Sequence, residues 1–373
     1  MRILIAPDSF KGSLSAVDFC RISRELIQAH WPEIEVISRP LADGGEGFVD
    51  AILYSGLAEK QLCSSLDPLG RPIQATWAWQ ADSQTAIIEM AQASGLPLLQ
   101  AHERDPFQAS TYGTGLVIQA AIEKGARNII LGLGGSATND GGAGALQALG
   151  VELLDPDQQP IATGAAGLAQ LATIGKIPAH LEQLNWQLAC DVTNPLLGEL
   201  GATAVYGPQK GVTAQTLPQF ERTLAHFAQL IEQRTGRTII SRPGAGAAGG
   251  MAGGFIGILN AQTESGFDLL AQAIKLEDCF AQRLDLVITG EGKLDAQTRH
   301  GKLPMRVAQM AQKYQVPTLG ICGQLSVAAE QMPEFLALFS LVQGVVDEQT
   351  AFAQTPQGLQ STLYSALRLF FHL

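Results

Sequence analysis

The sequence predicts an α/β protein with two α/β domains: a Rossmann- or flavodoxin-like domain built from both ends of the chain, and a second, Gly-rich α/β domain inserted into it. Short aliphatic runs alternate with longer amphipathic segments, which is typical of helices covering a largely parallel sheet. Both ends show this alternation, whereas the middle is richer in Gly and Ala. We expect the first domain at residues 1–90 and 284–373, the inserted domain at residues 91–283, and a site in the cleft between them.

The first domain is expected to start with a strand, a helix and a second strand. Aliphatic residues 3–6 form the first strand, and residues 15–30 show helical periodicity after a capping Ser15 or Ser13. Residues 35–38 form the second strand. Three strand-like stretches joined by turn residues follow, and they indicate antiparallel or mixed sheet at residues 62–66, 73–79 and 86–90.

In the remainder of the chain, predicted strands alternate with predicted helices. We expect strands at residues 128–133, 186–190, 284–289, 316–321 and 338–342. We expect helices at residues 111–125, 213–234, 301–314 and 357–371.

Composition excludes several classes of protein. The 373 residues include 24 Lys+Arg and 35 Asp+Glu, a formal net charge of −11, so a basic face for nucleic acid is not expected. The longest apolar stretch, residues 335–346, is too short to cross a bilayer and contains Ser340 and Gln343. The amino terminus does not resemble a signal peptide. The five Cys residues are widely spaced without a CxxC pair, which favours free thiols in a cytoplasmic protein.

Polar residues follow the first two predicted strands. Asp8, Ser9 and Lys11 come directly after the first strand, where a carboxylate, a hydroxyl and an ammonium can bind a metal and an anion together. Asp43 and Glu46 lie in the turn ADGGEG after the second strand, where glycines let backbone N–H groups approach a phosphate. A helix-entry loop and a capped surface turn are the alternative interpretations.

A Gly-rich segment, GLGGSATNDGG from Gly132, separates a predicted strand from a helix. It fits the dinucleotide fingerprint G-x-G-x-x-A, and Asp155 follows about 20 residues later. Against a dinucleotide site, Asn139 and Asp140 interrupt the tight helix start that a pyrophosphate-binding turn requires. The fingerprint recurs at residues 244–249, where close helix packing is the simpler interpretation. Gly-rich turns at helix starts bind anions in general, phosphate included.

Two further strand ends carry acids and lysines. Asp191 and Asn194 follow the strand at residues 186–190, where stabilisation of a turn is the alternative, and Lys210 lies farther along in the segment GPQKG. The densest charged cluster follows the strand at residues 284–289 and contains Glu291, Lys293, Asp295 and His300. A lone histidine is more often structural, but this one lies beside Arg299 and Lys302 at a predicted helix start, where an anion is favoured.

Together these strand-end loops combine carboxylates, lysines and Gly-rich turns. Phosphoryl transfer needs this mixture, because carboxylates hold Mg²⁺, cations offset charge on the moving phosphoryl group and N–H groups cradle the phosphates. The motifs of P-loop NTPases, protein kinases, zinc proteases and α/β-hydrolases do not occur in the sequence. The residues therefore indicate a small-molecule kinase.

The chain resembles the type-1 glycerate kinases of bacterial glyoxylate and sugar-acid metabolism. Matching segments occur in order along nearly the whole chain: APDSFKGSLSA from Ala6, PLADGGEGF from Pro40, GLGGSATNDGGAG from Gly132, CDVTNPLLG from Cys190, YGPQKG from Tyr206, GAGAAGGM from Gly244 and DLVITGEGKLDAQTRHGK from Asp285. The resemblance implies ATP-dependent phosphorylation of D-glycerate with Mg²⁺ in a two-domain α/β fold. It implies 2-phosphoglycerate as the product, with 3-phosphoglycerate as the alternative. Lys293-Leu294, where Arg-Ile is commoner, and Ala252-Gly253 are mild departures.

The chemistry of the reaction suggests a role for each candidate residue. Asp191 is expected to be the base for the glycerate hydroxyl, with Asn194 orienting it. Asp43 and Glu46 are expected to bind Mg²⁺, with Asp8 as a further candidate. The other expected catalytic or phosphate-facing residues are Lys11, Lys210, Glu291 and Lys293. The other expected substrate- or nucleotide-binding residues are Asp8, Ser9, Gly134, Gly135, Ser136, Asp295 and His300.

Two rival functions remain open at this point. An NAD(P)-dependent oxidoreductase would use residues 132–137 and would bind NAD(H) in place of ATP. A non-catalytic sensor would bind a sugar acid or a nucleotide without consuming ATP. The expected ligands are the small molecules D-glycerate and ATP, with no nucleic-acid or membrane partner, and the expected assembly is a monomer or a homodimer.

Overall fold

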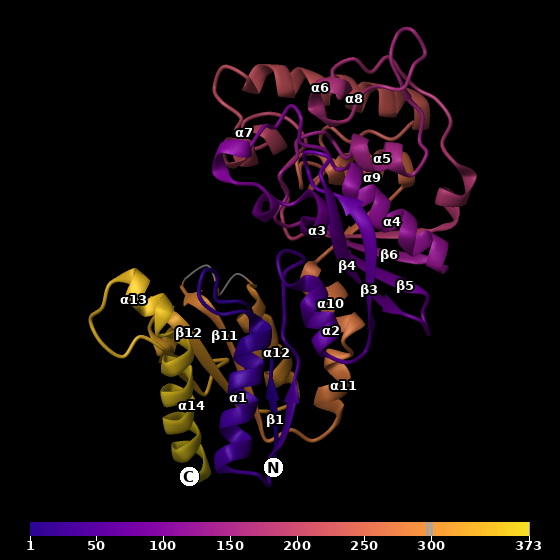
Figure 1. Cartoon of the computed structure of the whole chain (residues 1–373). Helices are drawn as coiled ribbons and strands as arrows, with labels where there is room; N and C mark the ends of the chain where they lie inside the picture. Colours follow the sequence, from indigo (N-terminus) through magenta and orange to yellow (C-terminus); the bar gives the residue numbers. More distant parts are fainter. Residues whose placement is uncertain (296–297, 299–300, 373) are drawn as a thin grey trace. The chain divides into compact units, whose positions relative to one another are not determined.

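The computed structural model describes residues 1–295, 298 and 301–372, and its secondary structure is mixed α/β, as the sequence predicts. The chain divides into two compact units, whose elements are labelled in Figure 1. Unit 1 consists of Met1–Ala42, Asp50–Leu57 and Leu270–Leu373, and unit 2 consists of Asp43–Val49 and Ala58–Leu269. The short helix α2 (Phe48–Tyr54) contains residues of both units.

Unit 1 is built on a parallel sheet in the order β13-β12-β11-β1-β2. Its strands are β1 (Arg2–Ile5), β2 (Glu35–Ser38), β11 (Leu286–Leu294), β12 (Thr318–Leu325) and β13 (Ala337–Ser340). β1 pairs with β11 through Ile5 and Ile288, so segments from near the two ends of the chain share one sheet.

Helices α1 (Ala16–His30) and α14 (Thr355–His372) lie side by side in unit 1 (Figure 1). Their apolar residues, among them Phe19 and Leu363, pack in one buried cluster with Ile3 and Ile288 of the sheet. α12 (Leu303–Lys313) packs against β11 and β12, and its Met305 belongs to a separate buried cluster. A parallel sheet that is covered by helices explains why residues 3–5 of β1 and 286–288 of β11 are all aliphatic and fully buried. The shorter helices of this unit are α11 (Leu276–Ala281) and α13 (Glu348–Ala353).

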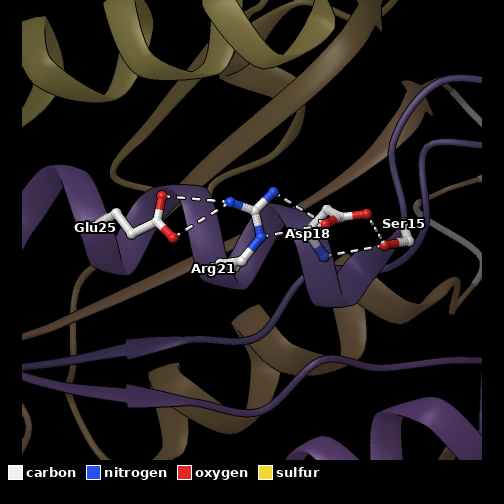
Figure 2. Close-up of polar contacts among 4 residues, drawn as sticks. All are labelled: Ser15, Asp18, Arg21 and Glu25. Atoms are coloured by element: carbon white, nitrogen blue, oxygen red, sulfur yellow. Dashed lines mark hydrogen bonds and ion pairs between the residues drawn. The ribbon is translucent and has the colours of Figure 1, made fainter.

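Helix α1 begins at one of the two caps that the sequence predicts. The Oγ atom of Ser15 accepts a hydrogen bond from the backbone N–H of Asp18 at 3.0 Å. This N–H group is one of those in the first turn of a helix that have no acceptor within the helix, and Ser15 supplies one. Arg21 forms ion pairs with Asp18 at 3.1 Å and with Glu25 at 3.3 Å, as Figure 2 shows. Exposed ion pairs at this spacing contribute little to stability, so α1 is stabilised mainly through its buried face.

Unit 2 is built on a mixed sheet in the order β10-β9-β6-β5-β4-β3. β3, β4 and β5 pair antiparallel, whereas β5, β6, β9 and β10 pair parallel. The strands are β3 (Glu59–Leu66), β4 (Pro72–Gln80), β5 (Thr85–Glu89), β6 (Asn128–Gly132), β9 (Asn185–Ala189) and β10 (Gln262–Glu264). β7 (Leu153–Leu154) and β8 (Thr173–Ile174) form a separate two-stranded sheet.

The division into units differs from the expected boundaries of residues 1–90 plus 284–373 and residues 91–283. Residues 58–90 were expected in the first domain, but β3, β4 and β5 belong to the sheet of unit 2. The physical reason is that β5, buried at all five positions, pairs with β6 through Ile87 and Ile130. At the other boundary, unit 1 resumes at Leu270, inside α10 (Gly266–Ala273), and not near residue 284. A domain organisation with an inserted second domain stays a prediction.

The helices of unit 2 share one large apolar core with its sheet. Close packing explains its Gly content: a Cβ at Gly115 of α4 would lie 2.6 Å from the carbonyl oxygen of Ala145 in α5. The helices are α3 (Ala91–Ser94), α4 (Tyr112–Lys124), α5 (Ala143–Ala148), α6 (Gly164–Leu168), α7 (Ala202–Tyr206), α8 (Leu217–Thr235) and α9 (Met251–Leu259). Across the part of the chain that the structure describes, we find no helix with the length and apolar character needed to span a membrane.

Candidate active site

The loops that follow β6 and β9 line a cavity of about 220 Å³ in unit 2. In proteins with parallel sheets, ligands bind at the carboxyl ends of the strands, and this cavity lies at the carboxyl ends of β6 and β9. It brings together several of the predicted site residues, namely Asp43, Gly134, Gly135, Ser136, Asp191 and Lys210. Residues that the sequence analysis did not single out for a role, among them Cys190, Tyr206, Gln209 and Ala248, also line it. The only sequence signal for these residues was that they lie in segments matched by the family resemblance.

The Gly-rich loop after β6 lies against the turn that contains Asp43. The backbone N–H of Gly134 donates a hydrogen bond to the carbonyl oxygen of Gly44 at 3.1 Å. A Cβ at Gly134 would lie 2.2 Å from the Cα of Gly45, so only glycine fits there. Gly135 has φ +73°, a left-handed conformation that side chains disfavour. The glycines therefore let two backbone segments approach closely at the wall of the cavity.

Lys210 has an exposed fraction of only 2%. It ends the short 3₁₀-helix Pro208–Lys210, and its Nζ atom donates to Ser136 Oγ at 2.7 Å and to the carbonyl oxygen of Thr138 at 2.8 Å. Burial lowers the pKa of Lys210 to about 7, although the negative charge of Asp140 acts in the opposite direction. The two hydrogen bonds direct the amino group of Lys210 at the Gly-rich loop.

Asp140, near the end of the same loop, is fully buried. Its carboxylate accepts hydrogen bonds from the N–H and Oγ1 of Thr111 at 2.9 Å, from the N–H of Gly142 at 3.1 Å and from the N–H of Gly144 at 3.3 Å. Burial raises the pKa of Asp140, and these hydrogen bonds act in the opposite direction. Asp140 thus ties the end of the loop to the starts of α4 and α5. The sequence analysis considered Asp140 only as an interruption of a helix start.

Asp191 follows β9 and lines the cavity. Both of its carboxylate oxygens lie 3.2 Å from the backbone N–H of Gly266, the first residue of α10. The Nδ2 of Asn194 donates to the carbonyl oxygen of Leu200 at 2.7 Å, and its Oδ1 accepts from the hydroxyl of Tyr206 at 2.8 Å. The side chain of Asn194 therefore orients Tyr206, and Tyr206 forms part of the cavity wall. The expected role of Asn194 beside Asp191 stays a prediction.

Of the two predicted metal-binding residues, the structure brings one to the cavity. Asp43 lines it, and its Oδ1 accepts from the N–H of Gly45 at 3.1 Å, whereas Glu46 is not among the lining residues; both side chains are exposed. Among the described residues no cluster of three or more His, Cys, Asp or Glu could hold a metal ion by itself. Mg²⁺ needs less than this, because it is commonly bound through one or two carboxylates together with water and substrate phosphates.

The geometry of a dinucleotide site is not found around residues 132–137. Such a site needs a helix that starts within the fingerprint, but α5 begins only at Ala143, after Gly142 in a left-handed conformation. Asp155 would have to bind a ribose, yet its Oδ1 accepts the N–H groups of Asp157 and Gln159, both at 2.9 Å, in a turn after β7. At the second fingerprint, a Cβ on Gly249 would lie 2.0 Å from the carbonyl oxygen of Thr138, which confirms close packing.

A second group of predicted residues lies in unit 1, at the carboxyl ends of β1 and β11. The backbone N–H of Asp8 donates to the carbonyl oxygen of Gly290 at 2.8 Å, and the N–H of Ser9 donates to Asp8 Oδ1 at 2.7 Å. A Cβ at Gly292 would lie 3.6 Å from the backbone nitrogen of Lys11, which places the two segments side by side. The side chain of Lys11 is exposed.

Glu291 and Lys293 lie on β11 itself, since this strand continues to Leu294 and does not end near residue 289 as expected. Glu291 is buried and accepts a hydrogen bond from the Oγ1 of Thr298 at 2.6 Å, a contact that the sequence gave no reason to expect. Burial raises the pKa of Glu291, while Thr298 and Lys302 act in the opposite direction. Lys302 Nζ lies 3.7 Å from Glu291 and 3.4 Å from Asp295.

A further contact of this group joins Lys293 to Asp295 at 3.8 Å. His300, which was predicted to bind a substrate or nucleotide, lies outside the described residues. Unit 1 therefore holds a network of acids and lysines in which the carboxylate of Glu291 is the most buried member.

Nearly the whole chain is similar to known glycerate kinases. The model of the glycerate kinase family matches residues 3–371. A glycerate kinase of Bacillus subtilis (strain 168) is 42% identical over 368 residues, which cover 97% of this chain and 96% of that protein. A glycerate 2-kinase of Escherichia coli (strain K12) is 41% identical over 354 residues, 93% of each chain. The crystal structure of a candidate glycerate kinase 2 from Salmonella typhimurium LT2 has 38% identity and a TM-score of 0.87, with full coverage of both chains. The chain therefore belongs to the glycerate kinase family, a family of phosphotransferases.

Proposed function

We propose that this chain transfers the γ-phosphoryl group of ATP to the 2-hydroxyl group of D-glycerate and releases 2-phosphoglycerate. Membership of the glycerate kinase family supports glycerate as the acceptor and ATP as the donor. The name of the Escherichia coli relative, glycerate 2-kinase, favours the 2-hydroxyl. The observation that carries the proposal is the cavity of unit 2, where the carboxylates of Asp43 and Asp191 and a Gly-rich loop meet.

Asp191 is the proposed general base. The hydrogen bond from Gly266 to both carboxylate oxygens holds this side chain in one orientation at the cavity wall. When the 2-hydroxyl oxygen of glycerate attacks the γ-phosphorus, its O–H bond breaks and the proton passes to an oxygen of Asp191. The bond between the γ-phosphorus and the bridging oxygen breaks, and ADP leaves with that oxygen.

Mg²⁺ is the proposed cofactor, and Asp43 is the proposed residue that holds it. The cavity fits this ion, because a second carboxylate, that of Asp43, lines it beside the proposed base. When bound, Mg²⁺ supplies positive charge to the β- and γ-phosphates. Glu46 stays a predicted ligand, and it is the weaker candidate of the two because it does not line the cavity.

The loop of Gly134, Gly135 and Ser136 is the proposed cradle for phosphate oxygens. Backbone that turns through a left-handed glycine can direct N–H groups at an anion, and the missing Cβ atoms allow close approach. The N–H of Gly134 already donates to Gly44, so we assign the cradle mainly to Gly135 and Ser136.

For unit 1 we propose the roles that the sequence predicts. Lys11 and Lys293 bind phosphate or the glycerate carboxylate, Glu291 takes part in catalysis, and the remaining members bind substrate or nucleotide (Asp8, Ser9 and Asp295). Their convergence at the carboxyl ends of β1 and β11 supports this assignment, because that edge of a parallel sheet is where ligands bind.

The cellular setting is part of the same proposal. We propose a role in glyoxylate and sugar-acid metabolism, in the cytoplasm, for a monomer or homodimer. The five cysteines of the described chain are free thiols, which is compatible with a reducing compartment.

ADP release from MgATP tests the proposed function. The purified chain should form ADP with D-glycerate and almost none without it, and it should ignore NAD(H). ADP release that does not depend on glycerate, or glycerate oxidation with NAD, would refute the proposal. Asp157→Asn, at an exposed turn of unit 2, is a control variant that should match the wild type.

A further inference from the structure

Lys210 makes both of its described hydrogen bonds to one short segment of the chain. The acceptors are the side chain of Ser136 and the backbone carbonyl of Thr138, two residues apart in the Gly-rich loop. Both residues are buried, at 6% and 0% exposed, so water cannot easily replace the ammonium as their partner. A buried lysine whose ammonium is held in this way is poorly placed to reach a ligand with the same group.

The same loop is held at its other end by Asp140. Its carboxylate receives four hydrogen bonds, from Thr111 and from the backbone of Gly142 and Gly144. Lys210 and Asp140 carry opposite charges and interact electrostatically. Residues 136–140 are thus held at one end by the buried amino group of Lys210 and at the other by the buried carboxyl group of Asp140.

We propose that Lys210 is a positioning residue, whose buried ammonium holds Ser136 and the backbone of Thr138 and thereby fixes the loop that lines the cavity. Lys210 thus acts on the ligand through the loop, whereas the sequence suggests that it contacts phosphate directly. A binding site works best when its groups are already in place before the ligand arrives. The loop of Gly134 and Gly135 has little stiffness of its own, because glycine has the freest backbone, and a fixed anchor next to it offsets that freedom.

Amide hydrogen exchange of the protein without ligand tests this role directly. In Lys210→Met, the peptides that cover residues 134–142 should exchange about tenfold faster or more, because two hydrogen bonds from a charged donor are lost. Peptides from β3 and β4 should exchange as in the wild type. Lys176→Met, which removes an exposed lysine of the same unit, is the matched control and should change neither region.

Ser136→Ala gives a second, milder test that does not remove the buried charge. It deletes one of the two acceptors of Lys210, so exchange at residues 134–142 should rise, but less than in Lys210→Met. This variant decides the question if Lys210→Met does not fold. Unchanged exchange at residues 134–142 in a folded Lys210→Met, or in Ser136→Ala where that variant decides, would overturn the proposal. A rise of equal size in β3 and β4 would also overturn it, because Lys210 would then serve only general stability.

Kinetics supply a separate readout, which rests on the proposed function. A positioning role predicts that Lys210→Met lowers kcat by about tenfold or more. An unchanged kcat in a variant with faster loop exchange would overturn the proposal, since the loop would then not need fixing. If the wild type forms no ADP with glycerate, the proposed function fails, and the exchange experiment still decides whether Lys210 fixes the loop.

Discussion

The Nζ atom of Lys210 lies 2.7 Å from the Oγ atom of Ser136, although 74 positions separate the two residues in the chain. This contact joins a buried cation to the loop that lines the cavity of unit 2. Because burial lowers the pKa of Lys210 to about 7, Lys210 also makes the stability of the folded protein depend on pH.

Lys210 should make the free energy of unfolding depend on pH between about 7 and 10.5. The unfolded chain keeps the ordinary lysine pKa of 10.5, so in this window it binds a proton that the folded chain does not. The contribution of Lys210 to the free energy of unfolding therefore rises with pH, by at most about 1.4 kcal/mol per pH unit. Below pH 7 both states are protonated and the effect is constant.

The measurement is denaturant unfolding of the wild type and of Lys210→Met at pH 7, 8 and 9. The wild type should gain stability relative to the variant as the pH rises. The comparison subtracts the titratable groups that both proteins share around Lys210, which are Asp43, Asp140, Asp191, Cys190 and Tyr206. A difference that stays constant across this range would mean that the lysine titrates with an ordinary pKa.

Asp191→Asn should lower kcat by about 10²–10⁴-fold with little change in KM for glycerate or in thermal stability. The amide keeps an oxygen that can accept the N–H of Gly266, but it cannot take up the proton of the hydroxyl. Steady-state kinetics measures this, with Asp157→Asn as the control at an exposed aspartate. Turnover within about twofold of the wild type would show that another group is the base.

Asp43→Asn should raise the Mg²⁺ concentration needed for half-maximal activity by roughly tenfold or more. Asp43 lines the cavity, whereas Glu46 does not, so Glu46→Gln should have the smaller effect. Activity is followed as Mg²⁺ is titrated at fixed ATP. The opposite order of the two variants would assign the ion to Glu46.

Glu291→Gln should lower activity while becoming more stable relative to the wild type as the pH rises. Burial raises the pKa of Glu291, so its stabilising contribution is fully present below the ordinary pKa of 4.5 and is lost as the pH rises through its folded value. Thermal unfolding at pH 4.5, 6 and 7 compares the two proteins. Glu330→Gln, at an exposed position of unit 1, is the matched control. A constant difference between wild type and Glu291→Gln would contradict the raised pKa.

Local patterns predict the elements of this fold well. Helix α1 begins after Ser15, and the strands and helices expected near both ends are present with small shifts at their ends. The division into units differs from the expected boundary at residue 90, because β5 pairs with β6 through Ile87 and Ile130, and this pairing depends on contacts far apart in sequence. The expected end of β11 was wrong: Gly290 and Gly292 suggest a loop, but a Cβ at Gly290 would lie 1.9 Å from the carbonyl oxygen of Ile321, so glycine is needed inside the paired strand.

The sequence indicates which residues belong to the candidate site better than it indicates the contacts that those residues make. Asp43, Ser136 and Asp191 meet at one cavity, since each belongs to a polar turn at the end of a strand. The segment around Lys210 has the pattern of a surface turn, and only the tertiary contact with the Gly-rich loop buries it. In the same way, Asn194 gives no local sign that it pairs with Tyr206.

The most direct measurement of the proposed activity identifies the product. The chain is incubated with MgATP and D-glycerate in the presence of enolase and pyruvate kinase, without phosphoglycerate mutase. Immediate formation of pyruvate together with ADP release is the predicted result, because enolase accepts only the 2-phosphate. ADP release without pyruvate would contradict 2-phosphorylation and assign the phosphate to the 3-hydroxyl, and the absence of glycerate-dependent ADP release would contradict the kinase activity itself.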